Sequence, residues 1–138
     1  MIHSETISLG TRGFCDIIDL TDQVMAIIER SRIENCLVTV FCPGSTAAVT
    51  TIEFEPGVLK DLQKAIEQMV PSNASYEHDQ RWGDGNGFSH VRAALMKPSL
   101  TLPLIQGRLS LGTWQQIVLI DFDNRKRHRE IVVHLMGE

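Results

Sequence analysis

The sequence predicts an α+β domain in which helices pack against a largely antiparallel sheet. Three observations support this prediction: β-branched segments occur at both ends of the chain, one central segment has helical periodicity, and no repeat or linker interrupts the 138 residues. A chain of this length buries enough surface for one core, so we expect a single domain over residues 1–138. Apolar residues make up 43% of the chain and charged residues 22%, as in ordinary globular proteins.

The N-terminal part predicts two strands and a helix. Residues 2–9 and 14–20 favour strands on either side of a turn rich in glycine. A helix is expected to begin at Thr21 or Asp22, both good capping residues, and to run to about Ile33. Its inner face would carry Val24, Ile27 and Ile28.

The middle of the chain contains the clearest helix. Strands are expected over residues 36–41 and 47–54, separated by Pro43-Gly44, which breaks regular structure. After Pro56 the apolar residues recur with the spacing of one buried helical stripe. The stripe consists of Val58, Leu59, Leu62, Ala65, Ile66 and Met69.

The C-terminal part predicts a short helix followed by three strands. The helix is expected over residues 89–96, and the strands over residues 99–105, 114–122 and 129–136. The last two strands flank residues 123–126, which favour a hairpin turn. Hairpins at both ends of the chain indicate antiparallel pairing.

Composition and charge exclude several classes of protein. The net charge of −4 gives no overall attraction to a phosphate backbone, so we expect no nucleic-acid partner. The apolar run at residues 24–28 is far too short to span a membrane, so we expect no membrane partner. Cys15, Cys36 and Cys42 are too few for a disulfide framework and are expected to be packing residues. A start without a basic, apolar leader favours the cytoplasm.

The longest gap between predicted elements follows the central helix. The 17 residues from Pro71 to Gly87 have no apolar period, and connections this long in a compact domain are commonly functional. The gap and the helix after it carry two histidines, two aspartates and an asparagine: His78, Asp79, Asp84, Asn86 and His90. Such groups serve as metal ligands or as acid–base groups. Their spacing matches no established metal motif, so an ordered cover loop is the alternative.

Two further candidates flank the strand at residues 47–54. The turn before it contains Ser45 and Thr46, whose hydroxyls next to a glycine could form an anion-binding nest; a plain turn is the alternative. Glu53 lies at the end of the strand. A glutamate there is either solvated or, if it faces the long loop, a general base or a metal ligand.

Two segments near the C-terminus carry distinctive polar residues. Residues 125–129 form the only basic cluster, which either keeps an edge strand solvated or clamps a phosphate group. The loop at residues 107–116 contains Trp114 and Gln115. These two residues either hold a ligand or a neighbouring subunit, or cover the core and satisfy backbone groups.

The sequence from residue 99 to residue 117 resembles the signature of the YjbQ-type family. The signature consists of residues 99–107 and, after four residues, Gly112-Thr113-Trp114-Gln115-Gln116-Ile117. Further matching blocks lie at residues 43–48, 51–53, 76–79, 82–87 and 89–93. The resemblance implies a compact α+β domain of the YjbQ-like fold that assembles as a homotrimer.

The resemblance also implies a divalent metal, zinc or magnesium, held by histidines of the long loop. Carried onto this sequence, the metal ligands are His78, His90 and Asp79, with Asp84 and Asn86 lining the site. Glu53 matches an acidic position of the family.

Some members of the family are described as secondary thiamine-phosphate synthases, so the resemblance implies a metal-dependent transferase. Such an enzyme joins a pyrimidine pyrophosphate to a thiazole phosphate and releases pyrophosphate. The implied catalytic residues are His78, His90, Glu53 and Asp84. The implied residues for binding a small phosphorylated substrate are Ser45, Thr46, Asn86, Arg92, Trp114 and Gln115. The alternative function is a non-catalytic trimeric protein that binds a metal or a metabolite.

The chain departs from the family pattern at two positions. Many relatives have a histidine where Gly44 stands and an asparagine where Ile52 stands. Any role of those two side chains is therefore absent from this chain.

Overall fold

The computed structural model describes all 138 residues, which form eight strands and four helices. In chain order the elements are β1 (Ile2–Thr11), β2 (Asp16–Asp19), α1 (Thr21–Ser31), β3 (Cys36–Phe41), β4 (Ala47–Ile52), α2 (Pro56–Met69), α3 (Glu77–Trp82), α4 (Gly87–Met96), β5 (Ser99–Ile105), β6 (Arg108–Leu109), β7 (Gln116–Asp121) and β8 (Arg127–Gly137).

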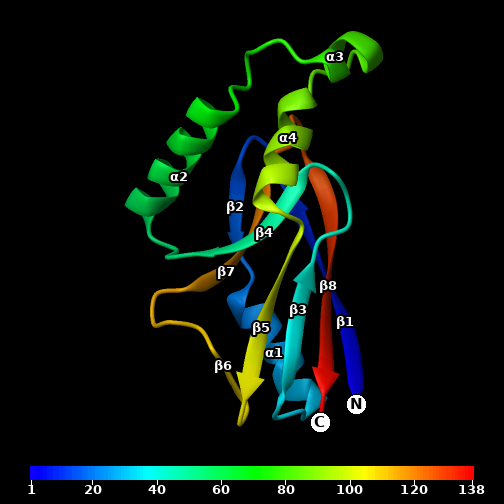
Figure 1. Cartoon of the computed structure of the whole chain (residues 1–138), viewed down its shortest axis with the longest axis vertical. Helices are drawn as coiled ribbons and strands as arrows, with labels where there is room; N and C mark the ends of the chain where they lie inside the picture. Colours follow the sequence, from blue (N-terminus) through cyan, green and yellow to red (C-terminus); the bar gives the residue numbers. More distant parts are fainter.

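The strands form two antiparallel sheets, which confirms the predicted α+β class. One sheet has five strands in the order β1-β8-β3-β5-β6, and the other has three strands in the order β2-β7-β4. The two ends of the chain lie side by side, since β1 pairs with β8 along its whole length from Ile2↔Met136 to Thr11↔Arg127 (Figure 1).

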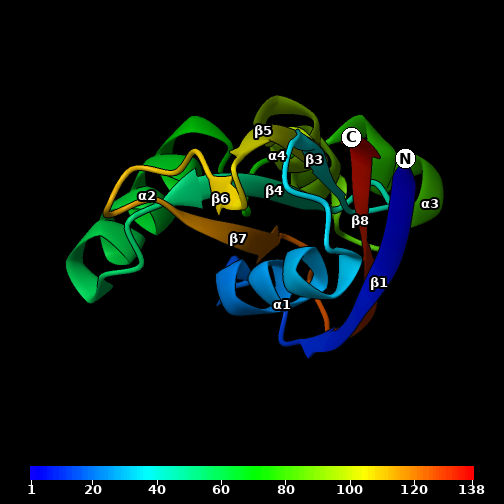
Figure 2. The same ribbon diagram turned by 90° about the horizontal axis from the view of Figure 1, so that it is seen from below.

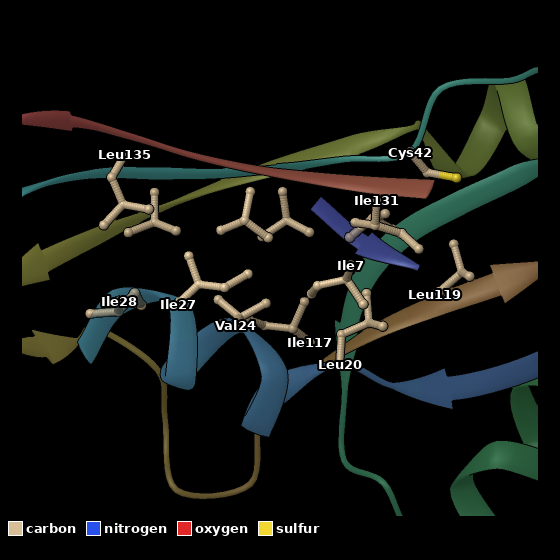
Figure 3. Close-up of a cluster of buried hydrophobic side chains, with 14 of the residues drawn as sticks. Ile7, Leu20, Val24, Ile27, Ile28, Cys42, Ile117, Leu119, Ile131 and Leu135 are labelled. Atoms are coloured by element: carbon tan, nitrogen blue, oxygen red, sulfur yellow. The ribbon is translucent and has the colours of Figure 1, made fainter. Parts of the chain in front are cut away.

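The larger of two hydrophobic clusters fills the space between the five-stranded sheet, α1 and the three-stranded sheet (Figure 2). The predicted inner face of α1 is confirmed, because Val24, Ile27 and Ile28 are all buried. In Figure 3 these side chains extend from α1 toward Leu135 of β8. Burial of a Leu, Ile or Val side chain contributes about 1.5–3 kcal/mol, so this cluster dominates the stability of the fold.

The central strand β7 separates this cluster from a second one. Successive residues of β7 belong alternately to the two clusters. Ile117 and Leu119 belong to the larger cluster, and Val118 and Ile120 belong to the smaller one. This division follows from the twofold side-chain alternation of a strand that is covered on both faces. The smaller cluster continues through Ile66 of α2 and Ala93 of α4.

Helix α2 is less buried than its sequence predicts. Glu55 caps its N-terminus by accepting hydrogen bonds from the backbone N–H groups of Gly57 and Val58. Of the predicted stripe, however, only Ile66 is fully buried, and Met69 is 65% exposed. The smaller cluster offers α2 too little surface, so the helix lies at the side of the molecule (Figure 1).

The two predicted hairpins are wrong. Strands β1 and β2 belong to different sheets, as do β7 and β8, so each connection crosses from one sheet to the other. In the first connection Gly13, Phe14 and Cys15 all have left-handed φ angles of 74°, 54° and 65°. The Phe14 N–H donates to the carbonyl of Asp123 at 2.7 Å, so the two crossing turns pack on each other.

Two elements were not expected. Helix α3 occupies six residues of the long loop, ending at Gly83 in a left-handed conformation (φ 73°), and β6 is a two-residue strand. A six-residue helix shows less than two turns of apolar period, so the sequence pattern misses it.

Two findings bear on the expectations from composition. No helix of the chain is long and apolar enough to cross a membrane. All three cysteines are free, with Cys15 and Cys42 buried. Burial raises the pKa of the Cys15 thiol to about 11, so this thiol is neutral at physiological pH.

The larger cluster predicts the cost of a cavity in it. Leu135 is fully buried, so Leu135→Ala should lower the free energy of unfolding by about 2–5 kcal/mol through lost burial and a residual cavity. Leu95 is 60% exposed, and Leu95→Ala should change it by less than about 0.5 kcal/mol. Urea unfolding at one fixed protein concentration measures both variants. Equal losses in the two would contradict this description of the core.

Candidate functional site

A polar cleft lies where α3, α4, the β3–β4 turn and the start of β8 meet. Its volume is about 380 Å³, and it is lined by Gly44, Ser45, Thr46, His78, Trp82, Asp84, Asn86, His90, Arg127 and Arg129. A larger hollow of about 620 Å³ runs along α1 and contains no histidine. Four of the residues singled out in the long loop and the helix after it, His78, Asp84, Asn86 and His90, therefore line the smaller, polar cleft.

Two short helices position the two histidines. Helix α3 carries His78, and α4, which begins at Gly87, carries His90. Asp79 joins the helices, because its carboxylate accepts the Gly87 N–H at 2.8 Å. Gly87 is required here, since a Cβ would lie 2.6 Å from the Cβ of Tyr76. The histidine rings lie 4.4 Å apart between centroids and are tilted by 41°.

Two buried polar atoms in the cleft have no hydrogen-bond partner: His78 Nδ1 and Asn86 Oδ1. His78 Nδ1 lies 3.4 Å from Asp84 Oδ1 and 3.8 Å from Asp79 Oδ1. Buried polar atoms are paired in the great majority of cases, so two orphaned atoms in one cleft indicate a missing partner.

Two aspartates and two arginines form a network at the cleft, in which all but the partly exposed Arg127 are buried. Asp121 is inaccessible to solvent, and it accepts two hydrogen bonds from Arg129, from Nε at 2.7 Å and from Nη2 at 2.9 Å. Arg127 Nε donates to the equally inaccessible Asp123 at 2.7 Å. Because these carboxylates are paired, their burial is not prohibitive.

Neighbouring elements are tied into this network. Thr46 accepts a hydrogen bond from Arg129 at 2.7 Å and donates to Asp123 at 3.1 Å. Asn86 Nδ2 donates to Asp123 at 3.2 Å, which fixes the start of α4. Burial by itself raises the pKa of Asp123, but the hydrogen bonds from Asn86 and Arg127 outweigh it and hold this pKa below its ordinary value.

The structure brings six of the predicted site residues into the cleft. They are Ser45, Thr46, His78, Asp84, Asn86 and His90. Asp79 lies beside them but already accepts a backbone N–H.

Arg92 does not reach the cleft. It is two residues after His90 on α4, about 200° around the helix, so the two side chains leave on opposite sides. Arg92 is buried, donates to the Val70 carbonyl and Glu67, and lines a separate cavity of about 280 Å³.

Glu53, Trp114 and Gln115 also lie elsewhere. Glu53 and Trp114 line a different hollow of about 530 Å³ beside the N-terminus of α2. Gln115 bonds within its own loop, accepting the Gly112 N–H at 2.7 Å, and donates to Thr51 at 3.3 Å. No contact links these three residues to the histidines.

Sequence reasoning left Arg127 and Arg129 out of the site. The basic cluster at residues 125–129 was expected to keep an edge strand solvated, and binding of a phosphate group was the alternative. A signal was present, because Asp121 and Asp123 precede Arg127 and Arg129 with the same two-residue spacing. Residues two apart in extended chain share a face, which allows the two pairs to face each other.

The residues of the cleft fit a divalent cation. The ligand atoms of His78, Asp79 and Asp84 lie within 4.8 Å of one another. Two ligands about 2.1 Å from a tetrahedral metal are about 3.4 Å apart, which is the distance from His78 Nδ1 to Asp84 Oδ1.

Comparison with known proteins identifies the family. The sequence profile described as UPF0047 protein YjbQ-like matches residues 5–138. The chain belongs to the YjbQ-like family. It is 36% identical over 137 residues to a UPF0047 protein of Methanothermobacter thermautotrophicus, an alignment that covers 99% of this chain and 94% of the relative. A UPF0047 protein of Archaeoglobus fulgidus is 37% identical over 126 residues, or 91% of this chain and 96% of the relative.

Solved structures of the YjbQ-like family share the fold. A YbjQ-like protein of unknown function from Sulfolobus solfataricus superposes with a TM-score of 0.90 at 29% identity and covers both chains fully. A YjbQ/UPF0047 protein from Clostridium acetobutylicum gives a TM-score of 0.87 at 32% identity over 96% of this chain and 99% of the other.

The function expected from the resemblance is wrong. None of these relatives carries a thiamine-related or transferase description, and the Sulfolobus protein is described as of unknown function. The relatives give no positive support to the alternative of a non-catalytic trimeric metal- or metabolite-binding protein either. That the chain is an enzyme stays a prediction.

The buried network predicts a large effect of one neutral substitution. Asp121→Asn leaves the guanidinium of Arg129 buried without a counter-charge and should lower the free energy of unfolding by about 3–5 kcal/mol. Glu130 lies next to Arg129 in sequence but is exposed, so Glu130→Gln should leave stability unchanged. Thermal and urea unfolding measure both. An Asp121→Asn variant as stable as the parent would mean that this pair does not support the fold.

Proposed function

We propose that the cleft binds a divalent metal ion through His78, Asp84 and His90. The observation that supports this most directly is the orphaned Nδ1 of His78, which is buried beside a carboxylate at metal-ligand spacing. A cation bound there would replace the hydrogen bond that this nitrogen lacks. When bound, such an ion would polarise an oxygen atom of a small molecule in the cleft.

The ligand types favour zinc over magnesium. Imidazole nitrogen suits zinc and related transition metals, whereas magnesium prefers oxygen ligands and keeps its water. Asp79 serves as a support rather than a ligand, since its carboxylate accepts the Gly87 N–H and so joins the two helices that carry the histidines. At 3.8 Å from His78 Nδ1 it makes no hydrogen bond to the nitrogen that would hold the ion.

The size and lining of the cleft leave room for a second ligand beside the ion. About 380 Å³ lies above residues that are nearly all polar, including the hydroxyls of Ser45 and Thr46. We therefore propose that a small polar molecule shares the cleft with the ion.

The test is metal binding by matched variants. Wild-type protein should bind one Zn²⁺ per chain, and His78→Ala should weaken this by at least about a hundredfold, because losing a residue that only supports a ligand already costs ten- to a hundredfold. His128→Ala is the control, since His128 is exposed on β8 and outside the cleft. Isothermal titration with Zn²⁺ and absorption spectra of Co²⁺-loaded protein measure both. Unchanged zinc affinity in His78→Ala would overturn the proposal.

We also propose that the outer face of the five-stranded sheet joins copies of the chain into the homotrimer that the resemblance implies. Exposed Ile2, Met136 and Leu37 are neighbours in register on β1, β8 and β3, and Pro103 continues the row on β5. A row of apolar side chains across four strands is typical of a surface that is covered in an assembly.

This assembly predicts the effect of a charge in the row. Leu37→Glu should convert a particle of about three times 15.5 kDa into one of 15.5 kDa, because a buried unpaired carboxylate opposes association. Met25→Glu, on exposed α1, should not change the mass. Light scattering after size-exclusion chromatography measures the particle mass of the wild-type protein and of both variants. A wild-type protein of 15.5 kDa at micromolar concentration would refute the assembly.

A further inference from the structure

The two arginines in the cleft keep unused donors after their buried partners are satisfied. The Nε of Arg127 donates to Asp123, and the guanidinium makes no other hydrogen bond, so both of its terminal nitrogens are free. In Arg129, Nε donates to Asp121 and Nη2 donates to both Asp121 and Thr46, which leaves Nη1 without a partner. Both side chains line the cleft.

Gly44 leaves the free nitrogen of Arg129 uncovered. A Cβ at position 44 would lie only 3.3 Å from Arg129 Nη1, and the φ angle of 123° is one that side-chain-bearing residues rarely adopt. The backbone of the β3–β4 turn therefore passes the arginine without a side chain above it. Ser45 follows, with a hydroxyl that makes no hydrogen bond within the chain and also lines the cleft.

The charges in the cleft are divided between two sides. The only carboxylate among its lining residues is Asp84, which lies 3.4 Å from His78 Nδ1. Asp121 and Asp123 lie beneath the arginines and are inaccessible to solvent. A ligand in the cleft thus meets guanidinium nitrogens and hydroxyls on one side, and imidazoles with one carboxylate on the other.

We propose that Arg127 and Arg129, with Ser45, form a binding site for a small tetrahedral oxyanion, the terminal phosphate or sulfate group of a ligand. Guanidinium groups match such oxygens with paired, charge-assisted hydrogen bonds. The buried aspartates hold both guanidiniums in place before the ligand arrives, so little side-chain entropy is lost on binding. Arg129 is 8% exposed, which limits competition from water.

This oxyanion site lies in the cleft that we propose for the metal ion, and its coupling to the metal rests on that proposed function. A cation held by His78 and Asp84 would neutralise the one carboxylate that lines the cleft and add positive charge near the oxyanion. Each ligand should then raise the affinity for the other by the same factor, as linkage requires.

The experiment is calorimetric titration at low ionic strength with three probes: inorganic phosphate, sulfate and acetate. Metal-free wild-type protein should bind phosphate and sulfate more tightly than acetate, because the tetrahedral ions carry more negative charge and offer more oxygens to the two arginines and Ser45. Zinc-loaded protein should bind sulfate at least about threefold more tightly than metal-free protein.

Matched variants identify the residues. Arg127→Gln should weaken sulfate binding about ten- to a hundredfold, the usual effect of losing charge-assisted hydrogen bonds. The sulfate affinity of Arg127→Lys should fall between those of Arg127→Gln and the parent, since lysine keeps the charge but lacks the planar fork that directs N–H groups at Asp123 and at the oxyanion. Arg125→Gln is the control on the same turn, because Arg125 is exposed and outside the cleft. Circular dichroism verifies that each variant is folded.

The outcomes separate the two proposals. Sulfate binding that depends on Arg127, in a protein that does not bind zinc, supports the oxyanion site and overturns the metal site. Zinc binding that depends on His78, with no sulfate or phosphate binding in either state, supports the metal site and overturns the oxyanion site. Equal sulfate affinity in Arg127→Gln and wild-type protein also overturns the oxyanion site.

Discussion

The two ion pairs Asp121–Arg129 and Asp123–Arg127 connect the sheets, the crossing turns and the cleft. Asp121 ends β7 in one sheet, and Arg129 lies in β8 of the other. Thr11 at the end of β1 donates to Asp121, and Asn86 at the start of α4 donates to Asp123. Charges buried this deeply are tolerated only with good partners, so the network favours the arrangement in which the sheets and α4 bring these partners together. Because α4 carries His90, the position of this histidine depends on the hydrogen bond from Asn86 to Asp123.

Most of the elements could be predicted from the sequence, whereas their pairing could not. The predicted strands at residues 36–41 and 99–105 match the observed bounds of β3 and β5, because short segments rich in β-branched and apolar residues favour strands. Such a segment does not report which strand lies next to it. Short connections such as residues 12–15 therefore favoured hairpins, although three left-handed residues there send the chain into the other sheet. Those φ angles are set by contact with the turn at Asp123, which is more than a hundred residues away.

The candidate site was predictable where its residues are close in sequence. His78, Asp84, Asn86 and His90 lie within 13 residues, and a long polar loop with a helix after it was sufficient to place them together. Arg92 shows the limit of this reasoning, because helical geometry turns it away from the histidine two residues earlier. Glu53 and Trp114 show a second limit. A single sequence does not indicate which end of the paired strands β4 and β7 lies near the long loop at residues 71–87, and these two residues lie at the other end.

The same buried aspartates would allow the proposed metal ion and the proposed oxyanion to share one small cleft. Without Asp121 and Asp123, two arginines next to an imidazole pair would repel a cation, and with the aspartates exposed the cleft would repel an anion. Burial of the aspartates beneath the guanidiniums avoids both kinds of repulsion. The carboxylates offset the arginine charge at a distance, while the unpaired N–H groups of the arginines stay available to donate to the oxygens of a bound anion. The pairs that join the sheets thereby also set the electrostatic balance of the cleft, so a substitution in the network should affect stability and ligand binding together.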